Sequence, residues 1–94
     1  MDKKLQTKIV EFLKSRDVKK IELFGSYARG EEREDSDIDL IVAFNKDIDL
    51  FDFVGVKLDL EEKLNKKVDL LTKDSISKYI LPYIEKEKRV LYYG

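Results

Sequence analysis

The chain has 94 residues, of which 41% are charged, and its 19 basic and 20 acidic side chains leave a net charge of −1. This balance argues against a general DNA- or RNA-binding protein, because no overall positive field would draw it to a phosphate backbone. The absence of cysteine and histidine excludes disulfides, zinc-finger ligands, a thiolate nucleophile and a histidine base.

The length favours a single domain over residues 1–94. No apolar run approaches the ~18 residues that a membrane span needs, and the first residues lack a signal-like apolar core. We therefore expect a cytoplasmic protein that does not associate with membranes. Any chemistry must come from carboxylates, hydroxyls, lysine, arginine and backbone amides.

The first half of the chain predicts a helix, two strands and a solvated loop. Apolar side chains at helical spacing predict an amphipathic helix over residues 3–15. Residues 19–24 alternate as a short strand that stops at Gly25, and residues 31–36 contain no apolar side chain and form a loop. Residues 37–44 are rich in β-forming side chains and predict a second, largely buried strand.

A second long helix is predicted next. Asp47 or Asp49 can cap its N-terminus, and the helical pattern continues to about Leu64. The side chains expected near its buried face are Leu50, Val54, Leu58 and Leu64.

The last third predicts a strand, a helix and a short terminal strand. Residues 66–72 form the strand, and Asp74 or Ser75 can cap a helix that Pro82 would kink or break early. Residues 90–93 can form the terminal strand. The apolar pattern of the helix comprises Ile76, Tyr79, Ile80, Tyr83 and Ile84. This order of elements predicts an α/β (α+β) fold with a small mixed sheet packed with helices.

Two aspartates stand at the start of the second strand. Asp37 and Asp39 are two residues apart, so on a strand they point to the same face, with Cα atoms about 6–7 Å apart. A lone pair of this kind is most often a strand end exposed to solvent. Asp69 lies between Val68 and Leu70 on the next predicted strand, and taken alone it is equally well a partly exposed strand acid. If the two strands are neighbours, the three acids form an oxygen-rich site suited to Mg²⁺.

A glycine turn precedes the acids. Gly25 follows a strand directly and permits the close approach of a ligand, and Ser26 adds a hydroxyl group. Exposed amides at this point favour phosphate oxygens. Arg29 can donate to the same anion or pair with the acidic loop, Glu31–Asp35, and the sequence leaves both open. Tyr27 is interpreted as a packing residue.

The resemblance to a known family lies in residues 25–42, which read GSYARGEEREDSDIDLIV. This string resembles the signature of the DNA polymerase β-like nucleotidyltransferase superfamily, in which Gly-Ser precedes Asp-x-Asp by some ten residues and a third Asp follows on a later strand. Its form is similar to the minimal nucleotidyltransferase (MNT) branch. Members of that branch are often encoded beside a HEPN protein as toxin–antitoxin pairs.

The resemblance implies the polymerase β-like fold and a Mg²⁺-dependent transfer of a nucleotide from ATP. In this reading Gly25 and Ser26 hold the β- and γ-phosphates, and Asp37 and Asp39 bind two Mg²⁺ ions. Asp69 completes the second metal site and helps to deprotonate the acceptor hydroxyl.

The implied partner is a HEPN RNase toxin, which family members neutralise by adenylylating a tyrosine or by contact alone. The leading reading is therefore a protein adenylyltransferase antitoxin that uses ATP and does not itself bind nucleic acid. A purely binding antitoxin, and a nucleotidyltransferase acting on a small molecule or an RNA end, are the alternatives. The tyrosines near the C-terminus are candidates for the partner contact; they are Tyr79, Tyr83, Tyr92 and Tyr93. For Tyr79 and Tyr83, the helical pattern favours the alternative that they are core residues of the last helix.

Overall fold

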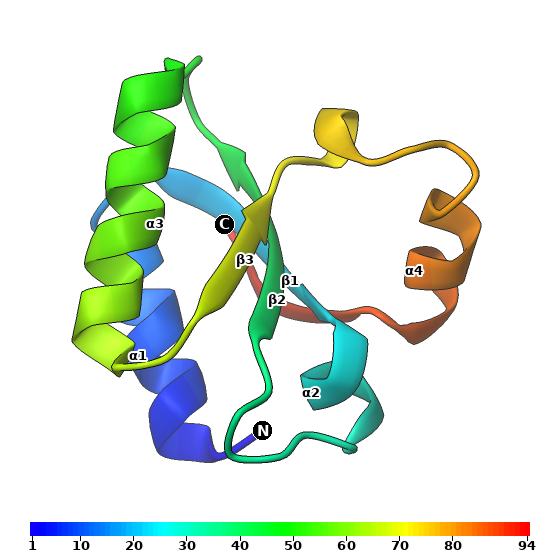
Figure 1. The fold of residues 1–94 in the computed structure, drawn as a ribbon. Helices are drawn as coiled ribbons and strands as arrows, with labels where there is room; N and C mark the ends of the chain where they lie inside the picture. The colour runs from blue at the N-terminus through cyan, green and yellow to red at the C-terminus, as the bar shows by residue number, and fades with distance from the viewer.

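A computed structural model describes all residues from 1 to 94 (Figure 1). Its elements are α1 (Lys3–Lys14), β1 (Val18–Phe24), α2 (Gly25–Arg29), β2 (Ile38–Phe44), α3 (Leu50–Leu64), β3 (Val68–Leu71), the 3₁₀ turn η1 (Lys73–Ser75), α4 (Leu81–Glu87) and β4 (Arg89–Tyr93). The four strands form one mixed sheet in the order β3-β2-β1-β4. Strands β2 and β3 are parallel, whereas β1 is antiparallel to both β2 and β4. The predicted fold class is confirmed.

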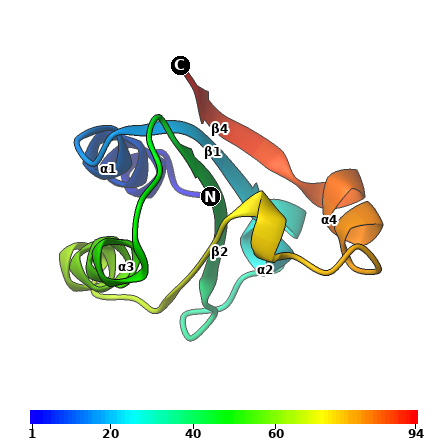
Figure 2. The ribbon, with the colours of Figure 1, turned by 90° about the horizontal axis from the view of Figure 1, so that it is seen from above.

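The helices divide between the two sides of the sheet. Figure 2 shows α1 and α3 together against one face, while α2 and α4 lie on the other side. The core fills the first of these layers, where side chains of both helices meet alternate residues of the strands, among them Ile9, Leu13, Ile21, Leu23, Ile38, Leu40, Val42, Leu60, Val68 and Leu70. No helix is both long enough and apolar enough to cross a membrane.

Helix α3 begins after Asp49, one of the two predicted caps, but buries a different face. Asp49 caps it, since its side chain accepts a hydrogen bond from the Asp52 amide at 2.8 Å. The buried residues are Val56, Leu60 and Leu64, whereas the predicted core positions Leu50, Val54 and Leu58 are exposed. Leu50, Val54 and Leu58 repeat every four residues. Val56, Leu60 and Leu64 do the same, so spacing alone cannot decide which set is buried. Packing against α1 and the sheet decides which face is buried. Of the four predicted core positions, only Leu64 is buried.

The last helix also departs from the prediction. A 3₁₀ turn, Lys73–Ser75, stands where the helix was expected to begin, and α4 starts only at Leu81 with Pro82 in its first turn. Proline lacks an amide hydrogen and clashes with the preceding turn, so it is tolerated at a helix start and not within one. As a consequence, Tyr79 and Tyr83 are 76% and 73% exposed. Their interpretation as core residues was wrong.

Candidate active site

The parallel pairing of β2 and β3 brings two of the predicted acids together. In the register of these strands, Asp39 lies directly opposite Asp69. Their neighbours Ile38, Leu40 and Val68 are buried against α1 and α3. Because side chains alternate along a strand, Asp39 and Asp69 project from the other face of the sheet. The predicted proximity of these two acids is confirmed, while their role as metal ligands stays a prediction.

The local electrostatics make Asp39 the most perturbed acid of the group. Its pKa is raised from 3.8 to about 6, mainly because burial penalises the charged carboxylate and then because Asp69 and Asp37 are negatively charged. The positive charge of Arg29 partly offsets this rise. Asp37 precedes β2, is exposed, and acts on Asp39 through its charge. A cation beside these carboxylates would relieve their mutual repulsion.

The glycine turn lies against Asp39. Gly25 is the first residue of α2 and has a φ of +72°, which favours glycine. A Cβ atom at this position would collide with the Asp39 carboxylate. In this structure the close neighbour of Gly25 is therefore a side chain of the protein itself, and the close approach of a ligand stays a prediction. Ser26 is partly exposed, and Tyr27 is buried, as its interpretation as a packing residue requires.

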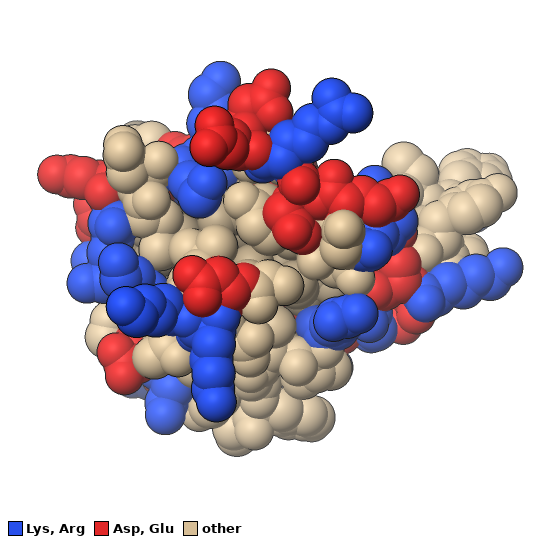
Figure 3. All heavy atoms as spheres, turned by 90° about the horizontal axis from the view of Figure 1, so that it is seen from below, with Lys and Arg blue, Asp and Glu red and all other residues tan.

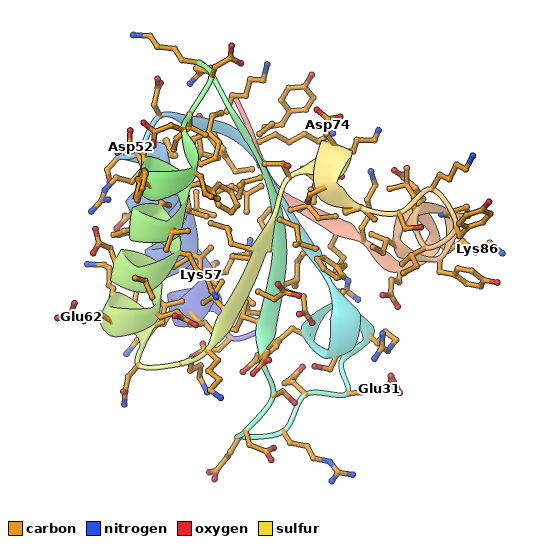
Figure 4. The ribbon with its side chains drawn as sticks, turned by 45° about the horizontal axis from the view of Figure 1, so that its top comes forward. Glu31, Asp52, Lys57, Glu62, Asp74 and Lys86 are labelled. Carbon is orange, nitrogen blue, oxygen red and sulfur yellow. The ribbon has the colours of Figure 1, made fainter.

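Arg29 is engaged by two carboxylates. Its Nε donates to Glu31 Oε1 at 2.6 Å and its Nη1 donates to Glu87 Oε2 at 2.9 Å. Of the two predicted uses of Arg29, the structure contains the ion pair with the acidic loop, to which Glu31 belongs. Figure 4 shows Glu31 on the segment that leaves α2.

Glu87, the last residue of α4, is a site residue that the sequence analysis missed. Its Oε1 accepts a hydrogen bond from the Gly25 amide at 3.2 Å while its other oxygen binds Arg29. Both contacts lower the pKa of the Glu87 carboxyl, and the hydrogen bond from Arg29 has the larger effect. Glu87 is 58 residues from Arg29 in the sequence, on a helix whose start was mispredicted, so no local pattern indicated the contact.

The donor set has the chemistry of a magnesium site, although no group of three or more acidic side chains is assembled closely enough to hold a metal by itself. Mg²⁺ is commonly bound by one or two carboxylates together with waters and substrate phosphates. The half-buried Asp39 and the exposed Asp69, paired across β2 and β3, provide two such carboxylates. The residues therefore fit a cation that arrives with phosphate ligands.

Comparison with known proteins yields one family and several relatives. The nucleotidyltransferase domain family matches residues 6–91 of the chain. A predicted protein adenylyltransferase of Methanocaldococcus jannaschii is 47% identical over 72 residues, which make up 77% of each chain. The protein adenylyltransferase MntA of Thermococcus cleftensis is 40% identical over 70 residues, or 74% of this chain and 71% of that protein.

Among solved structures, a crystal structure of a toxin–antitoxin with AMP-PNP superimposes with a TM-score of 0.82. The superposition covers 95% of this chain and 73% of that one, at 26% sequence identity. The similarity therefore extends over nearly all of the elements described above, including the two strands that carry the paired aspartates.

Proposed function

The chain belongs to the family of nucleotidyltransferase domains, and on this premise we propose that it is an antitoxin that adenylylates a HEPN RNase toxin. The transfer would move AMP from ATP to a hydroxyl group of the toxin, a tyrosine hydroxyl by resemblance to other family members, in a Mg²⁺-dependent reaction. The observation that carries the proposal is the register of β2 and β3, which sets Asp39 beside Asp69 at the glycine turn.

The relatives support this choice among nucleotidyltransferase reactions. Two of them are named as protein adenylyltransferases and cover more than two thirds of both chains compared. The matching crystal structure is described as a toxin–antitoxin with AMP-PNP, an ATP analogue. A protein acceptor also suits a chain that has no strong positive field for nucleic acid. Figure 3 shows acidic and basic side chains mixed over the lower face of the molecule.

In the proposed mechanism the residues of the chain orient the triphosphate and manage one proton. The Gly25 amide and the Ser26 hydroxyl donate to the β- and γ-phosphates, while Asp37, Asp39 and Asp69 would hold the magnesium ions. Bound Mg²⁺ supplies positive charge for the attacking and leaving oxygens.

The acceptor oxygen forms a bond to the α-phosphorus as the bond from that phosphorus to the bridging oxygen breaks, and pyrophosphate leaves. Asp69 takes up the proton of the acceptor hydroxyl. The sequence offers no histidine, which is the usual general base, so the base in this proposal is a carboxylate.

The test is to incubate the purified protein with its candidate HEPN partner, ATP and Mg²⁺, and to measure the partner's mass. We expect an added AMP, which Asp39→Asn abolishes while circular dichroism shows an intact fold. Glu62→Gln is a matched control, because Glu62 points outward from α3, away from the site (Figure 4), and this variant should retain transfer.

Two other outcomes would redirect the proposal. A partner that stays unmodified yet loses its RNase activity would indicate neutralisation by contact alone. Transfer of label from α-labelled ATP to RNA or to a small molecule, with none to the partner, would indicate a different acceptor.

A further inference from the structure

The place where phosphate oxygens are expected is filled by a side chain of the protein. We call the Gly25 amide and the Arg29 guanidinium the phosphate cradle; together with the Ser26 hydroxyl they are the donors predicted to receive the nucleotide, and they are the two that Glu87 contacts. Both donors bind the two carboxylate oxygens of Glu87, at 3.2 Å and 2.9 Å. A carboxylate that bridges an amide and a guanidinium uses the same hydrogen-bonding groups that a phosphate would use.

Glu87 and an incoming phosphate cannot both occupy this position. The Gly25 amide has a single hydrogen to donate, and the Asp39 carboxylate already occupies the space that a Cβ atom on Gly25 would need. Glu87 also adds negative charge beside Asp39. A phosphate that approached Gly25 with Glu87 in place would meet two carboxylates.

We propose that Glu87 occupies the phosphate cradle of the nucleotide-free protein and that a nucleotide must displace its carboxylate in order to bind. The inference rests on the proposed function, since it takes Gly25 and Arg29 as phosphate donors. Because Glu87 must be displaced first, the affinity of every ligand that binds at the cradle is lowered by the same factor. Free phosphate or pyrophosphate has few other contacts and is kept out, whereas a nucleotide, which offers further contacts beyond the cradle, is retained.

The neighbourhood of Glu87 allows this displacement without unfolding α4. The adjacent residue, Lys88, forms ion pairs of 2.6 Å with the buried Glu22 on β1 and of 2.8 Å with Glu85. The ion pair with Glu22 attaches the end of α4 to the sheet independently of Glu87. The side chain of Glu87 is 26% exposed, so it can rotate away from the cradle toward solvent.

The variant that tests the proposal is Glu87→Gln, which keeps the shape of the side chain and removes its charge. The probe is the Mg²⁺ complex of an ATP analogue with a methylene group between the α- and β-phosphorus atoms, which cannot transfer AMP. We expect the dissociation constant of this analogue, measured by calorimetry, to fall by about three- to tenfold. The dissociation constant of magnesium pyrophosphate should fall by the same factor.

The control is Glu85→Gln, which removes the same charge two residues away on the same helix. Glu85 pairs with Lys88 and Lys73 and makes no contact with the cradle, so its loss should leave both dissociation constants unchanged. A second variant, Glu87→Asp, keeps the charge but shortens the side chain, and it should also bind the analogue more tightly. This second variant keeps the inference testable if Glu87→Gln fails to fold.

A direct readout comes from labelling the glycine amides with ¹⁵N, because the chain contains only 4 glycines. Glu87→Gln should shift the Gly25 amide peak in the nucleotide-free protein, and the other three peaks should stay in place. After saturation with the analogue, the Gly25 peaks of the wild type and the variant should coincide, since residue 87 no longer touches the amide.

The possible outcomes separate the two proposals. Weaker or unchanged binding by the Glu87 variants, with a wild type that binds the analogue, would overturn the displacement and leave the proposed function standing. Weaker binding in particular would mean that Glu87 holds Arg29 in position for the nucleotide. If neither the wild type nor the Glu87 variants bind the analogue, the proposed function fails and this inference fails with it.

Discussion

Replacing Asp39 with asparagine should make the metal-free protein more stable while it abolishes transfer. The carboxyl pKa of Asp39 is raised from 3.8 to about 6 in the folded chain, so folding disfavours its charged form. In full, such a rise corresponds to about 3 kcal/mol of lost stability at neutral pH. Because Asp39 is only partly buried, solvent screening reduces this figure to about 1 kcal/mol.

The sign of the pH dependence follows from the same shift. Between pH 3.8 and about 6 the folded state keeps a proton that the unfolded state has lost, so stability falls as the pH rises through this window. Below it Asp39 is neutral in both states. The asparagine variant is always neutral at this position and escapes the penalty.

The assay is thermal unfolding in EDTA from pH 4 to pH 7.5. We expect Asp39→Asn to melt about 4–8 °C above the wild type at pH 7.5, as about 1 kcal/mol implies for a domain of this size, and the difference to disappear near pH 4. Magnesium with the ATP analogue should then stabilise the wild type and leave the variant unchanged. Glu62→Gln serves again as the control: it should melt like the wild type at each pH and keep the stabilisation by magnesium with the analogue. A variant that melts at or below the wild type at pH 7.5 would refute the reasoning.

Four further variants test the glycine turn, helix α3 and the proposed partner surface. Gly25→Ala should lose nucleotide binding and about 2 kcal/mol of stability. Gly30→Ala, with nearly the same φ but open space around it, should cost only about 1 kcal/mol. Equal costs in chemical denaturation would contradict the predicted collision between the added methyl group and Asp39. Gly55→Ala, inside α3 with no atom near its added methyl group, should instead stabilise the protein by about 0.5–1 kcal/mol. Replacing both exposed tyrosines, Tyr79 and Tyr83, with serine should leave the melting temperature nearly unchanged and weaken binding to the proposed HEPN partner about tenfold. Unchanged affinity in a pull-down titration would exclude this surface.

The placement of Asp39, Asp69 and the glycine turn could be predicted because it depends on local rules, while the roles of these residues stay predictions. Side chains alternate between the two faces of a strand. Because the residues on both sides of Asp39 and of Asp69 are apolar, the sequence predicts that the two aspartates point away from the core. The end of β1 before Gly25 could be predicted in the same way, because a strand followed by Gly-Ser indicates a turn. What the pattern left open was whether β2 and β3 are neighbours, and the parallel pairing settles this point.

The features that escaped prediction depend on contacts between distant segments. The two apolar stripes of α3 have the same spacing, and only the position of α1 determines that Val56 and Leu60 are buried. For α4, the prediction weighed a helical pattern more heavily than Pro82, and the proline instead fixes the start of the helix. Glu87 could not be assigned to the site until the end of that helix was placed beside α2.

The parallel pairing of β2 and β3 has a consequence for the lengths of the connecting loops. The register that sets Asp69 beside Asp39 is fixed by the short link from α3, where Asn65 adopts a left-handed conformation with a φ of 51°. Removing one residue from positions 65–67 would slip β3 by one step and turn Asp69 into the core. The segment 31–36 has no such constraint, because β2 is held in register by β1. Among homologous chains, we therefore expect insertions and deletions before the first two aspartates and a constant spacing before the third.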